Sequence, residues 1–440
     1  MTPCPVSLVD AGHFSFEREQ MMTRVEPGST VLVLGAGIVG LCTALALQRR
    51  GLAVTLIDSG EPGAGCSAGN AAMIQVGSSL PLAAPGLLRR VPGMLTDPEG
   101  PLVMRWRHLP ALMPWGLKLL RNATPEAAAR NEAALAGLLS GARRAFDDLL
   151  AGTPAHGVIR NRGELYVVRT EQAFAAYRAK IEACRYNGVE IEVLDAARIR
   201  ELEPLLSPEY RHGVYVPGSA YVDHPQRLST MIFDQFLAEG GQFERCRIVK
   251  GGRSVEGQPF LTSDSGRTIG AERLVVAAGS AAGTVSGWFG PRLPIEPQRG
   301  YHITLPPGAD ALQGPVIEGE MSIAVSPVGG VNRVAGTMEF AGLFAAPDWR
   351  RAEMLMPLAR RMIPTLPGQI ETRWYGDRPG TPDSVPVLGP RKGDDRIWYA
   401  CGHGMLGLTL SARSGLLLAA AMTGDAQAAQ ALAASSPDRF

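Results

Sequence analysis

The chain has 440 residues, enough for two structural units or more and for a large hydrophobic core. Lys and Arg number 43 against 42 Asp and Glu, so the net charge of +1 argues against nucleic acid or an anionic membrane as a partner held by bulk charge. A hydrophobic content of 45% with 19% charged residues argues against a disordered chain. Six cysteines without CxxC or metal-ligand spacing predict a reduced compartment, no disulfide framework and no metal site.

The first 27 residues carry Asp10, Glu17 and Arg18 and lack a continuous apolar run, so we expect an N-terminal extension rather than a secretory signal. Two uncharged stretches, 31–48 and 274–291, are interrupted by glycine and small polar residues. A membrane span needs about 20 mostly apolar residues, so neither stretch predicts a transmembrane helix.

The first elements predict a βαβ unit. Residues 30–34 (TVLVL) predict a strand buried on both faces, 41–50 a helix, and 52–57 a second strand. The turn after the first strand reads Gly35-Ala36-Gly37-Ile38-Val39-Gly40. In such a GxGxxG turn the first glycine permits the bend, the second lets the backbone approach a pyrophosphate, and the third packs helix against strand. Asp58 follows Gly35 by 23 positions and, with Ser59 beside it, is the candidate for the ribose end of a dinucleotide.

Later segments predict a second, β-rich unit. Residues 125–150, 171–186 and 226–239 predict helices, 164–169 a strand, and 274–278 a buried strand that stops at Gly279. Alternation from about 295 to 370, as in 301–305 and 322–325, predicts an antiparallel sheet with one open face.

The end of the chain predicts a strand at 397–401, a break at Gly402-His403-Gly404 and an apolar helix to about 422. This arrangement directs a second helix N-terminus into the site, which suits a flavin because its pyrimidine end becomes negative on reduction. The pattern therefore favours FAD over NAD. A buried C-terminal helix with a glycine-rich start is the alternative.

Together these elements predict an α/β chain of two interleaved domains. We expect a Rossmann-type FAD-binding domain from 28–85, 210–295 and 375–435, and an antiparallel β-sheet substrate domain from 86–209 and 296–374.

Several motifs carry a family resemblance, among them VLVLGAGIVG (31–40), SAGNAAMIQ (67–75), RPGTPDSVPVLGP (378–390) and GHGMLGLTLSARSG (402–415). They are spread over roughly 31–425. The chain resembles the FAD-dependent D-amino-acid oxidase/dehydrogenase superfamily and is most similar to small-subunit-type bacterial D-amino-acid dehydrogenases. This resemblance implies the same two-domain fold.

The resemblance also implies cofactor contacts at three further places. A loop along the FAD diphosphate and ribityl chain would comprise Ser67, Ala68, Gly69, Asn70 and Ala71. Val249 would contact the adenine, and Ala278 and Gly279 would form the strand end near the ribityl phosphates. The flavin-facing helix start would comprise Gly404, Met405, Leu406, Gly407, Leu408 and Thr409. Cys66 and Ala72 depart from the residues usual in relatives. Some members hold FAD through a cysteine where this chain has Arg378, so we expect non-covalent FAD.

Three residues are the candidates for catalysis. A guanidinium grips a planar carboxylate with two hydrogen bonds, and the resemblance implies this role for Arg378. An ion pair with Asp377 or Asp383 is its alternative. Tyr301 is the second candidate for the same carboxylate, with Arg299 weaker. His403 could pack over the flavin, cap the helix or, less favoured, act as a base.

These parts predict an FAD-dependent dehydrogenase that moves hydride from the Cα of a D-amino acid to flavin N5, giving an imine or 2-oxo acid. D-proline or a hydroxy-D-proline is a candidate substrate by resemblance only. Residues 332–336 lack the lysine that related oxidases place near the flavin, which favours quinone or the respiratory chain as electron acceptor.

The stretch 104–121 combines apolar and basic side chains, so it could lie on a membrane or pack as a lid. We expect a cytoplasmic protein, with peripheral contact at the inner face of the membrane as the alternative. Three other functions stay open: a glycine/sarcosine-type oxidase that makes hydrogen peroxide, a flavin-binding subunit of a larger complex, and a tRNA-modifying flavin domain, which the net charge disfavours.

Overall fold

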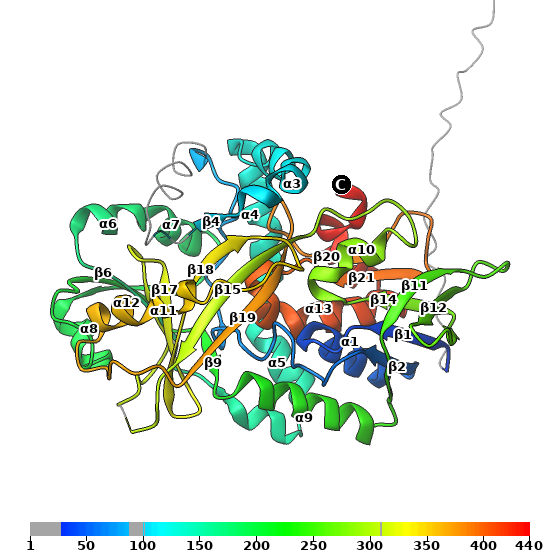
Figure 1. Cartoon of the computed structure of the whole chain (residues 1–440), viewed down its shortest axis with the longest axis horizontal. Coiled ribbons are helices and arrows are strands. Elements are labelled where there is room, and N and C mark those ends of the chain that lie inside the picture. The colour runs from blue at the N-terminus through cyan, green and yellow to red at the C-terminus, as the bar shows by residue number, and fades with distance from the viewer. Residues whose placement is uncertain (1–27, 88–99, 101, 309) are drawn as a thin grey trace, which may run out of the picture.

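The computed structural model describes residues 28–87, 100, 102–308 and 310–440. The predicted extension at 1–27 lies outside these residues. Two large sheets lie next to each other (Figure 1). Residues of both sheets line one wide cavity. Helices cover the outer face of each sheet.

The first sheet has six strands in the order β10-β2-β1-β14-β21-β20, and it brings together segments that are far apart in the chain. Their bounds are β1 Thr30–Leu34, β2 Ala53–Asp58, β10 Gln242–Arg245, β14 Arg273–Val276, β20 Val387–Pro390 and β21 Ile397–Cys401. All neighbours pair in parallel except β20, which runs antiparallel to β21. The strands predicted at 30–34 and 397–401 are confirmed with the same bounds.

One face of this sheet packs on α13 (Gly407–Met422), which contacts α1 (Ile38–Arg49), α4 (Pro125–Leu139) and α5 (Ala142–Leu150). Gly415 makes the close approach of α13 to α1 possible, because a Cβ there would lie 2.8 Å from backbone atoms of Cys42. Among the described residues one helical run, Gly404–Met422, is long and apolar enough to cross a membrane, and 78% of that stretch is buried in this core.

The second sheet has nine strands and forms the other wall of the cavity. Its path is β19-β15-β18-β17-β16-β6-β8-β7, with β4 beside β18. The strands are β4 Leu102–Met104, β6 Glu164–Val168, β7 Glu192–Asp195, β8 His212–Val216, β15 Glu296–Thr304, β16 Val316–Glu318, β17 Ile323–Val328, β18 Val331–Phe340 and β19 Thr372–Gly380. The antiparallel sheet predicted over 295–370 is confirmed for β15 to β18. Two strands from earlier in the chain join this sheet in parallel, β6 beside β16 and β4 beside β18. One face packs on α11 (Arg350–Glu353) and α12 (Leu355–Met362), and the other faces the cavity.

Smaller elements complete the chain. They are β3 Met73–Ile74, β5 Ile159–Arg160, β9 Ala220–Val222, β11 Ile248–Arg253, β12 Pro259–Ser263, β13 Thr268–Gly270, α3 Leu109–Arg121, α6 Glu171–Ala176, α7 Arg178–Tyr186, α8 Ala196–Leu202, α9 Pro225–Ala238, α10 Ala282–Ser286 and α14 Ala426–Leu432, with the 3-10 turns η1 Trp106–His108, η2 Pro154–Val158, η3 Gly279–Ala281, η4 Gly404–Leu406, η5 Ala433–Ser435 and η6 Pro437–Arg439. The helix predicted at 125–150 is divided at Ser140 and Gly141. The helix predicted at 171–186 is divided at Tyr177, where neither Gly nor Pro signals a break.

The predicted domain boundaries stay a prediction, but the sheets and cores do not follow all of them. Strand β8 and residues 375–380 lie in the nine-stranded sheet, although 210–295 and 375–435 were expected in the FAD-binding domain. Helices α4 and α5, expected in the substrate domain, pack in the core around α13. An amphipathic pattern indicates that a helix covers a core without saying which core.

Candidate active site

A cavity of about 1350 Å³ lies at the carboxyl ends of β1, β2 and β14 and continues along the inner face of the nine-stranded sheet. Ligands of open parallel sheets bind at this edge. The volume exceeds the ~300–1,000 Å³ of ordinary ligand pockets, so the cavity suits an elongated ligand together with a smaller one.

The turn after β1 has the geometry that the GxGxxG pattern requires. Gly35 has a φ of +111°, and a Cβ there would lie 2.4 Å from the Ala277 carbonyl oxygen. A Cβ on Gly40 would lie 1.8 Å from the Gly35 oxygen, so Gly40 packs helix against strand and does not line the cavity. Ala36, Gly37, Ile38 and Val39 do line it. The start of α1 is therefore open to an anionic ligand.

Asp58 lies at the end of β2 and faces the same space, with Ser59 next to it. Its Oδ2 accepts a hydrogen bond from the Ala36 N–H at 2.7 Å, and its Oδ1 accepts one from the Gly60 N–H at 2.9 Å. These bonds hold the carboxylate beside the glycine turn, where a ribose of a bound dinucleotide would lie.

Val249 does not line the cavity. It lies on β11 with 49% of its surface exposed, whereas Cys246, Arg247 and Ile248 line the cavity. Successive side chains of a strand point to opposite faces, so a shift of one residue from Ile248 removes Val249 from the site. Ala278 and Gly279, after β14, are part of the cavity lining.

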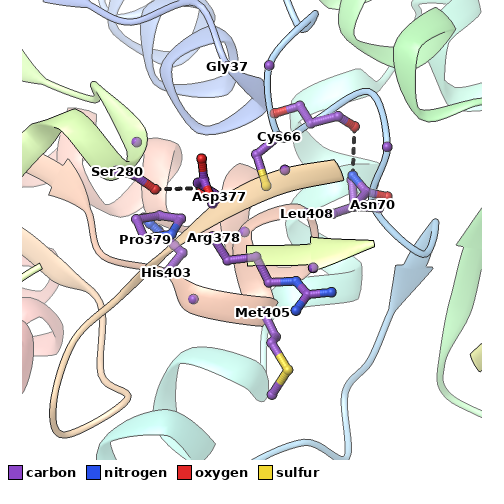
Figure 2. Close-up of a pocket in the computed structure, with 18 of the residues that line it drawn as sticks. Gly37, Cys66, Asn70, Ser280, Asp377, Arg378, Pro379, His403, Met405 and Leu408 are labelled. Atoms are coloured by element: carbon purple, nitrogen blue, oxygen red, sulfur yellow. Dashed lines mark hydrogen bonds between the residues drawn. The ribbon is translucent and has the colours of Figure 1, made fainter. Parts of the chain in front are cut away.

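The loop that carries Ser67, Ala68, Gly69, Asn70 and Ala71 crosses the middle of the cavity, and all but Ala68 line it. Ser67 Oγ accepts a hydrogen bond from the Ile38 N–H at 2.9 Å, which joins the loop to the start of α1. Asn70 Nδ2 donates to the Ser67 carbonyl at 2.8 Å (Figure 2).

Two side chains of the second sheet, Arg333 and His302, hold this loop from the other side, and the sequence did not predict this role for either of them. Arg333 Nη1 donates to the carbonyls of Ala68 (3.2 Å) and Asn70 (2.9 Å), and burial lowers its pKa to about 10. His302 Nδ1 bonds the Gly69 carbonyl at 2.9 Å, and burial lowers the pKa of His302 to about 3. Arg333 thus lies on β18, within the segment 332–336 that lacks an oxidase-type lysine.

The break before α13 forms the far end of the cavity. Gly404, Met405, Gly407 and Leu408 line it, whereas Leu406 and Thr409 do not. Thr409 Oγ1 instead accepts a hydrogen bond from the Gln75 N–H at 3.1 Å, and so fixes the strand that follows the loop.

His403 lines the cavity but is almost entirely buried. Its Nε2 lies 3.0 Å from the Oγ of Ser414, which is in the middle of α13. Burial lowers the pKa of His403 to about 3, so its ring is neutral at physiological pH. A neutral, hydrogen-bonded ring fits packing beside a ligand better than the role of a base.

Arg378 reaches the cavity from β19. In the register of β19 with β15, Trp374, Gly376 and Arg378 lie opposite His302, Gly300 and Gln298. The guanidinium lies over Gly300, since a Cβ there would be 2.1 Å from Nη2. Figure 2 shows the side chain extending into the space lined by Cys66, Met405 and Leu408.

Both acids that could have neutralised Arg378 are paired with other arginines. Asp377 Oδ1 accepts a hydrogen bond from Arg299 Nε at 2.8 Å, and Asp383 Oδ2 accepts one from Arg439 Nε at 2.7 Å. Among the described residues Arg378 has no hydrogen-bond or ion-pair partner, and burial lowers its pKa. Arginine stays protonated in proteins, so a positive charge faces the cavity.

Tyr301 and Arg299 alternate with Gly300 along β15, so their side chains leave the other face of the strand, although Tyr301 still contributes to the cavity lining. Tyr301 Oη donates to Glu339 Oε2 at 2.5 Å and accepts from the Asp348 N–H at 2.9 Å. Burial and Glu339 raise the pKa of Tyr301 to about 12. Its hydroxyl is therefore occupied within the sheet.

A polar group at the β6 end of the cavity was not found from the sequence. Glu164 accepts hydrogen bonds from Tyr166 Oη (3.1 Å) and Gln75 Nε2 (3.0 Å), and Lys180 Nζ donates to Tyr166 Oη at 3.0 Å. Burial raises the pKa of Glu164 and lowers that of Lys180. No motif links these positions, which three separate segments supply.

The stretch 104–121 packs as a helix rather than lying free. Leu112 and Trp115 of α3 pack against Phe340, and Trp115 Nε1 donates to the Gly380 carbonyl at 3.1 Å. Apolar side chains of this region line the cavity: Leu82, Leu102, Leu119, Met338, Phe340 and Leu343. The outer side of α3 and its approach exposes Trp106, Met113, Leu117 and Leu120.

Residues 30–421 match the family described as FAD dependent oxidoreductase (DAO). The chain belongs to this family. This chain is 34% identical over 425 residues to a D-amino-acid oxidase of Bradyrhizobium diazoefficiens, and the match covers 94% of this chain and 99% of the relative. It is 32% identical over 406 residues to D-amino acid dehydrogenase 2 of Ralstonia nicotianae, covering 88% and 95%.

Solved structures agree with the fold. The glycine oxidase from Geobacillus kaustophilus superposes with a TM-score of 0.70 at 22% identity, covering 94% of this chain and 99% of the other. The glycine oxidase from Bacillus cereus gives 0.69 at 18% identity, covering 90% and 95%. The family assignment confirms the predicted α/β fold, the enzyme class and FAD as the cofactor.

Proposed function

We propose that this FAD-dependent oxidoreductase is a D-amino-acid dehydrogenase. The observation that carries the proposal is the Arg378 guanidinium, which has no partner within the described part of the chain and lies in the cavity that the glycine turn also lines. A buried positive charge needs an anionic partner, and the planar carboxylate of an amino acid fits it with two hydrogen bonds. Relatives named D-amino acid dehydrogenase match this chain over most of their length, which supports the substrate class.

FAD would be held along the whole cavity. The turn Gly35–Gly40 leaves room for the diphosphate, Asp58 and Ser59 would bind the adenosine ribose, and the loop through Asn70 would follow the ribityl chain. The open start of α13 at Gly404–Leu408 would face the flavin. FAD bound there supplies the hydride acceptor.

The chain's own residues orient the substrate. Arg378 would hold the carboxylate, and the wall of Leu102, Leu119, Met338 and Phe340 would exclude water from the side chain. No strong base is required once the amine is neutral, which agrees with a neutral His403 bonded to Ser414. Loss of hydride from Cα gives an imine, which hydrolyses to a 2-oxo acid and ammonia, or persists as a cyclic imine from a D-proline.

The electron acceptor is the finer part of the proposal. Related oxidases place a lysine on this strand to assist the reaction with oxygen, whereas this chain has Arg333 there. Arg333 is hydrogen-bonded to the loop at 67–71. The exposed apolar side chains Trp106, Met113 and Leu117, with Arg107 near them, would suit contact with a membrane that supplies quinone. A D-amino-acid oxidase is the second candidate, favoured by the relative of that name at 34% identity.

The test is a panel of D- and L-amino acids, including glycine, sarcosine, D-proline and hydroxy-D-proline, assayed with a dye acceptor and with an oxygen electrode. We expect dye reduction by D-amino acids and little oxygen uptake. Peroxide formation as fast as dye reduction would show that the enzyme is an oxidase rather than a dehydrogenase. Flavin that loses its colour without any amino acid would favour a subunit of a larger complex.

A further inference from the structure

Strand β18 contains a bulge directly beside the Arg378 site. Arg299 pairs with Glu339 and Tyr301 with Gly336, so Gly300 on β15 faces two residues, Thr337 and Met338. On the far face of the sheet Tyr301 donates to Glu339 and Arg299 donates to Asp377. A Cβ on Gly336 would lie 2.9 Å from Leu355 on that face. Thr337 and Met338 therefore share the cavity face with Gly300, and both line the cavity.

Thr337 is unfavourable in two ways. Its φ is +60°, a left-handed conformation that a β-branched residue rarely adopts. It is 7% exposed, and its Oγ1 has no hydrogen-bond partner among the described residues. A strained residue with an unpaired buried hydroxyl, at the edge of a ligand cavity, is typical of a group that serves a ligand.

Gly300 relates this hydroxyl to Arg378. The Arg378 guanidinium lies over Gly300 from the β19 side, and the bulge with Thr337 borders Gly300 from the β18 side. A carboxylate has about four lone-pair directions, and a bidentate guanidinium uses two of them. A hydroxyl across the glycine can supply a further donor, because threonine turns its O–H by rotation about a single bond.

We propose that Thr337 is a substrate-binding residue whose hydroxyl donates to the α-carboxylate that Arg378 holds. This inference rests on the proposed function, since it assigns a second donor to the same anion. It also accounts for a threonine at a backbone position that favours glycine: the ligand requires the hydroxyl.

The experiment uses the FAD-loaded enzyme with three replacements, Thr337→Val, Thr337→Ser and Thr337→Gly. Valine keeps the shape and removes the hydroxyl, serine keeps the hydroxyl, and glycine removes it while fitting the positive φ. Two quantities are measured: kcat/KM with the best D-amino acid, and the dissociation constant of propionate from the rise in Tm with its concentration.

We expect Thr337→Val and Thr337→Gly to weaken propionate binding and lower kcat/KM about tenfold or more, while Thr337→Ser stays within about threefold of the parent. Ethylamine, which has no carboxylate, should raise Tm by the same amount in all four proteins. Unchanged propionate binding in both Thr337→Val and Thr337→Gly would overturn the inference. If the parent protein binds propionate but oxidises no D-amino acid, the proposed function fails while the Thr337 test still stands.

Discussion

Arg378 has no hydrogen-bond or ion-pair partner among the described residues, in contrast to Arg299 and Arg439. Arg299 is tied to Asp377 and lies 4.7 Å over the Tyr375 ring, and Arg439 is tied to Asp383. Removing the partner of a buried charge is costly, so a site with a lone guanidinium is arranged for an anion that comes from outside. At this scale the substrate role depends on which carboxylates are already paired.

Replacing Arg378 by alanine should raise KM for a D-amino acid by about two orders of magnitude, equivalent to about 3 kcal/mol. The reason is the loss of two charge-assisted hydrogen bonds to the carboxylate. The yellow colour of bound flavin should persist. Steady-state kinetics give KM, and the absorbance spectrum gives FAD content.

Tyr301→Phe is the matched control, since Tyr301 bonds Glu339 and Asp348 on the other face of the sheet. It should lower stability while leaving KM within about twofold. A large KM in Tyr301→Phe together with a normal KM in Arg378→Ala would reverse the two assignments.

His403 predicts a pH dependence of stability. Its pKa of about 3 in the folded protein lies below the usual 6.5, so the unfolded chain binds a proton that the folded chain does not. The stabilising effect is complete above pH 6.5 and is lost as the pH falls towards 3. Between pH 7 and pH 5 this one residue should remove about 2 kcal/mol from the free energy of unfolding.

Chemical denaturation at several pH values tests this in His403→Asn, which should show a shallower loss of stability below pH 6.5 than the parent. His224→Asn, at an exposed histidine, should follow the parent. Parallel curves for His403→Asn and the parent would contradict a neutral buried ring.

At the level of secondary structure, β15 and β19 form the wall of the cavity from which Arg378 extends. Gly300 and Gly376 face each other, and Arg378 and Trp374 lie flat over them, because a Cβ on either glycine would come within 2.1 Å of those side chains. The absence of a side chain at these glycines thus allows the Arg378 guanidinium to lie close to the backbone of the sheet. Neither has a positive φ, so space rather than backbone conformation explains them.

Gly300→Ala should lift the guanidinium and raise KM by about tenfold, with little loss of stability because the displaced group is the free end of a flexible side chain. Gly270→Ala, in strand β13 where the nearest atom to a Cβ is 3.7 Å away, serves as the control and should leave KM unchanged. Kinetics with thermal unfolding distinguish the two effects. A collapse of Tm in Gly300→Ala, without a KM effect in the surviving protein, would argue against this account.

At the scale of the whole molecule, one cavity of about 1350 Å³ separates the six-stranded sheet from the inner face of the nine-stranded sheet. The loop through Asn70 joins them, since it bonds α1 through Ser67 and the second sheet through Arg333 and His302. A cofactor along this loop would contact both sheets and tie the folding of one to the other.

Removal of FAD should therefore lower the Tm of the whole chain in one transition. Acid treatment should release the flavin, because position 378 is an arginine and cannot form a cysteinyl bond to FAD. Burial also raises the pKa of the nearby Cys66 thiol to about 11, so Cys66 stays protonated at neutral pH. FAD at a thousandfold excess over its dissociation constant should restore about 4 kcal/mol, and NAD should not. Calorimetry of apo and reloaded protein measures the shift. Flavin that stays with acid-precipitated protein would show a covalent bond instead.

Local patterns in the sequence predict the βαβ unit, the glycine turn with Asp58 as its candidate partner, and the strand before α13, because each depends on apolar runs, turn glycines and short spacing. The family resemblance added Arg378 and the loop at 67–71. Only the folded chain shows that the Tyr301 hydroxyl bonds Glu339, that Ile248 rather than Val249 lines the cavity, and that Asp377 and Asp383 are paired with other arginines. Strand register and pairing between distant segments set these features, and in a strand one residue of shift exchanges the buried face for the other.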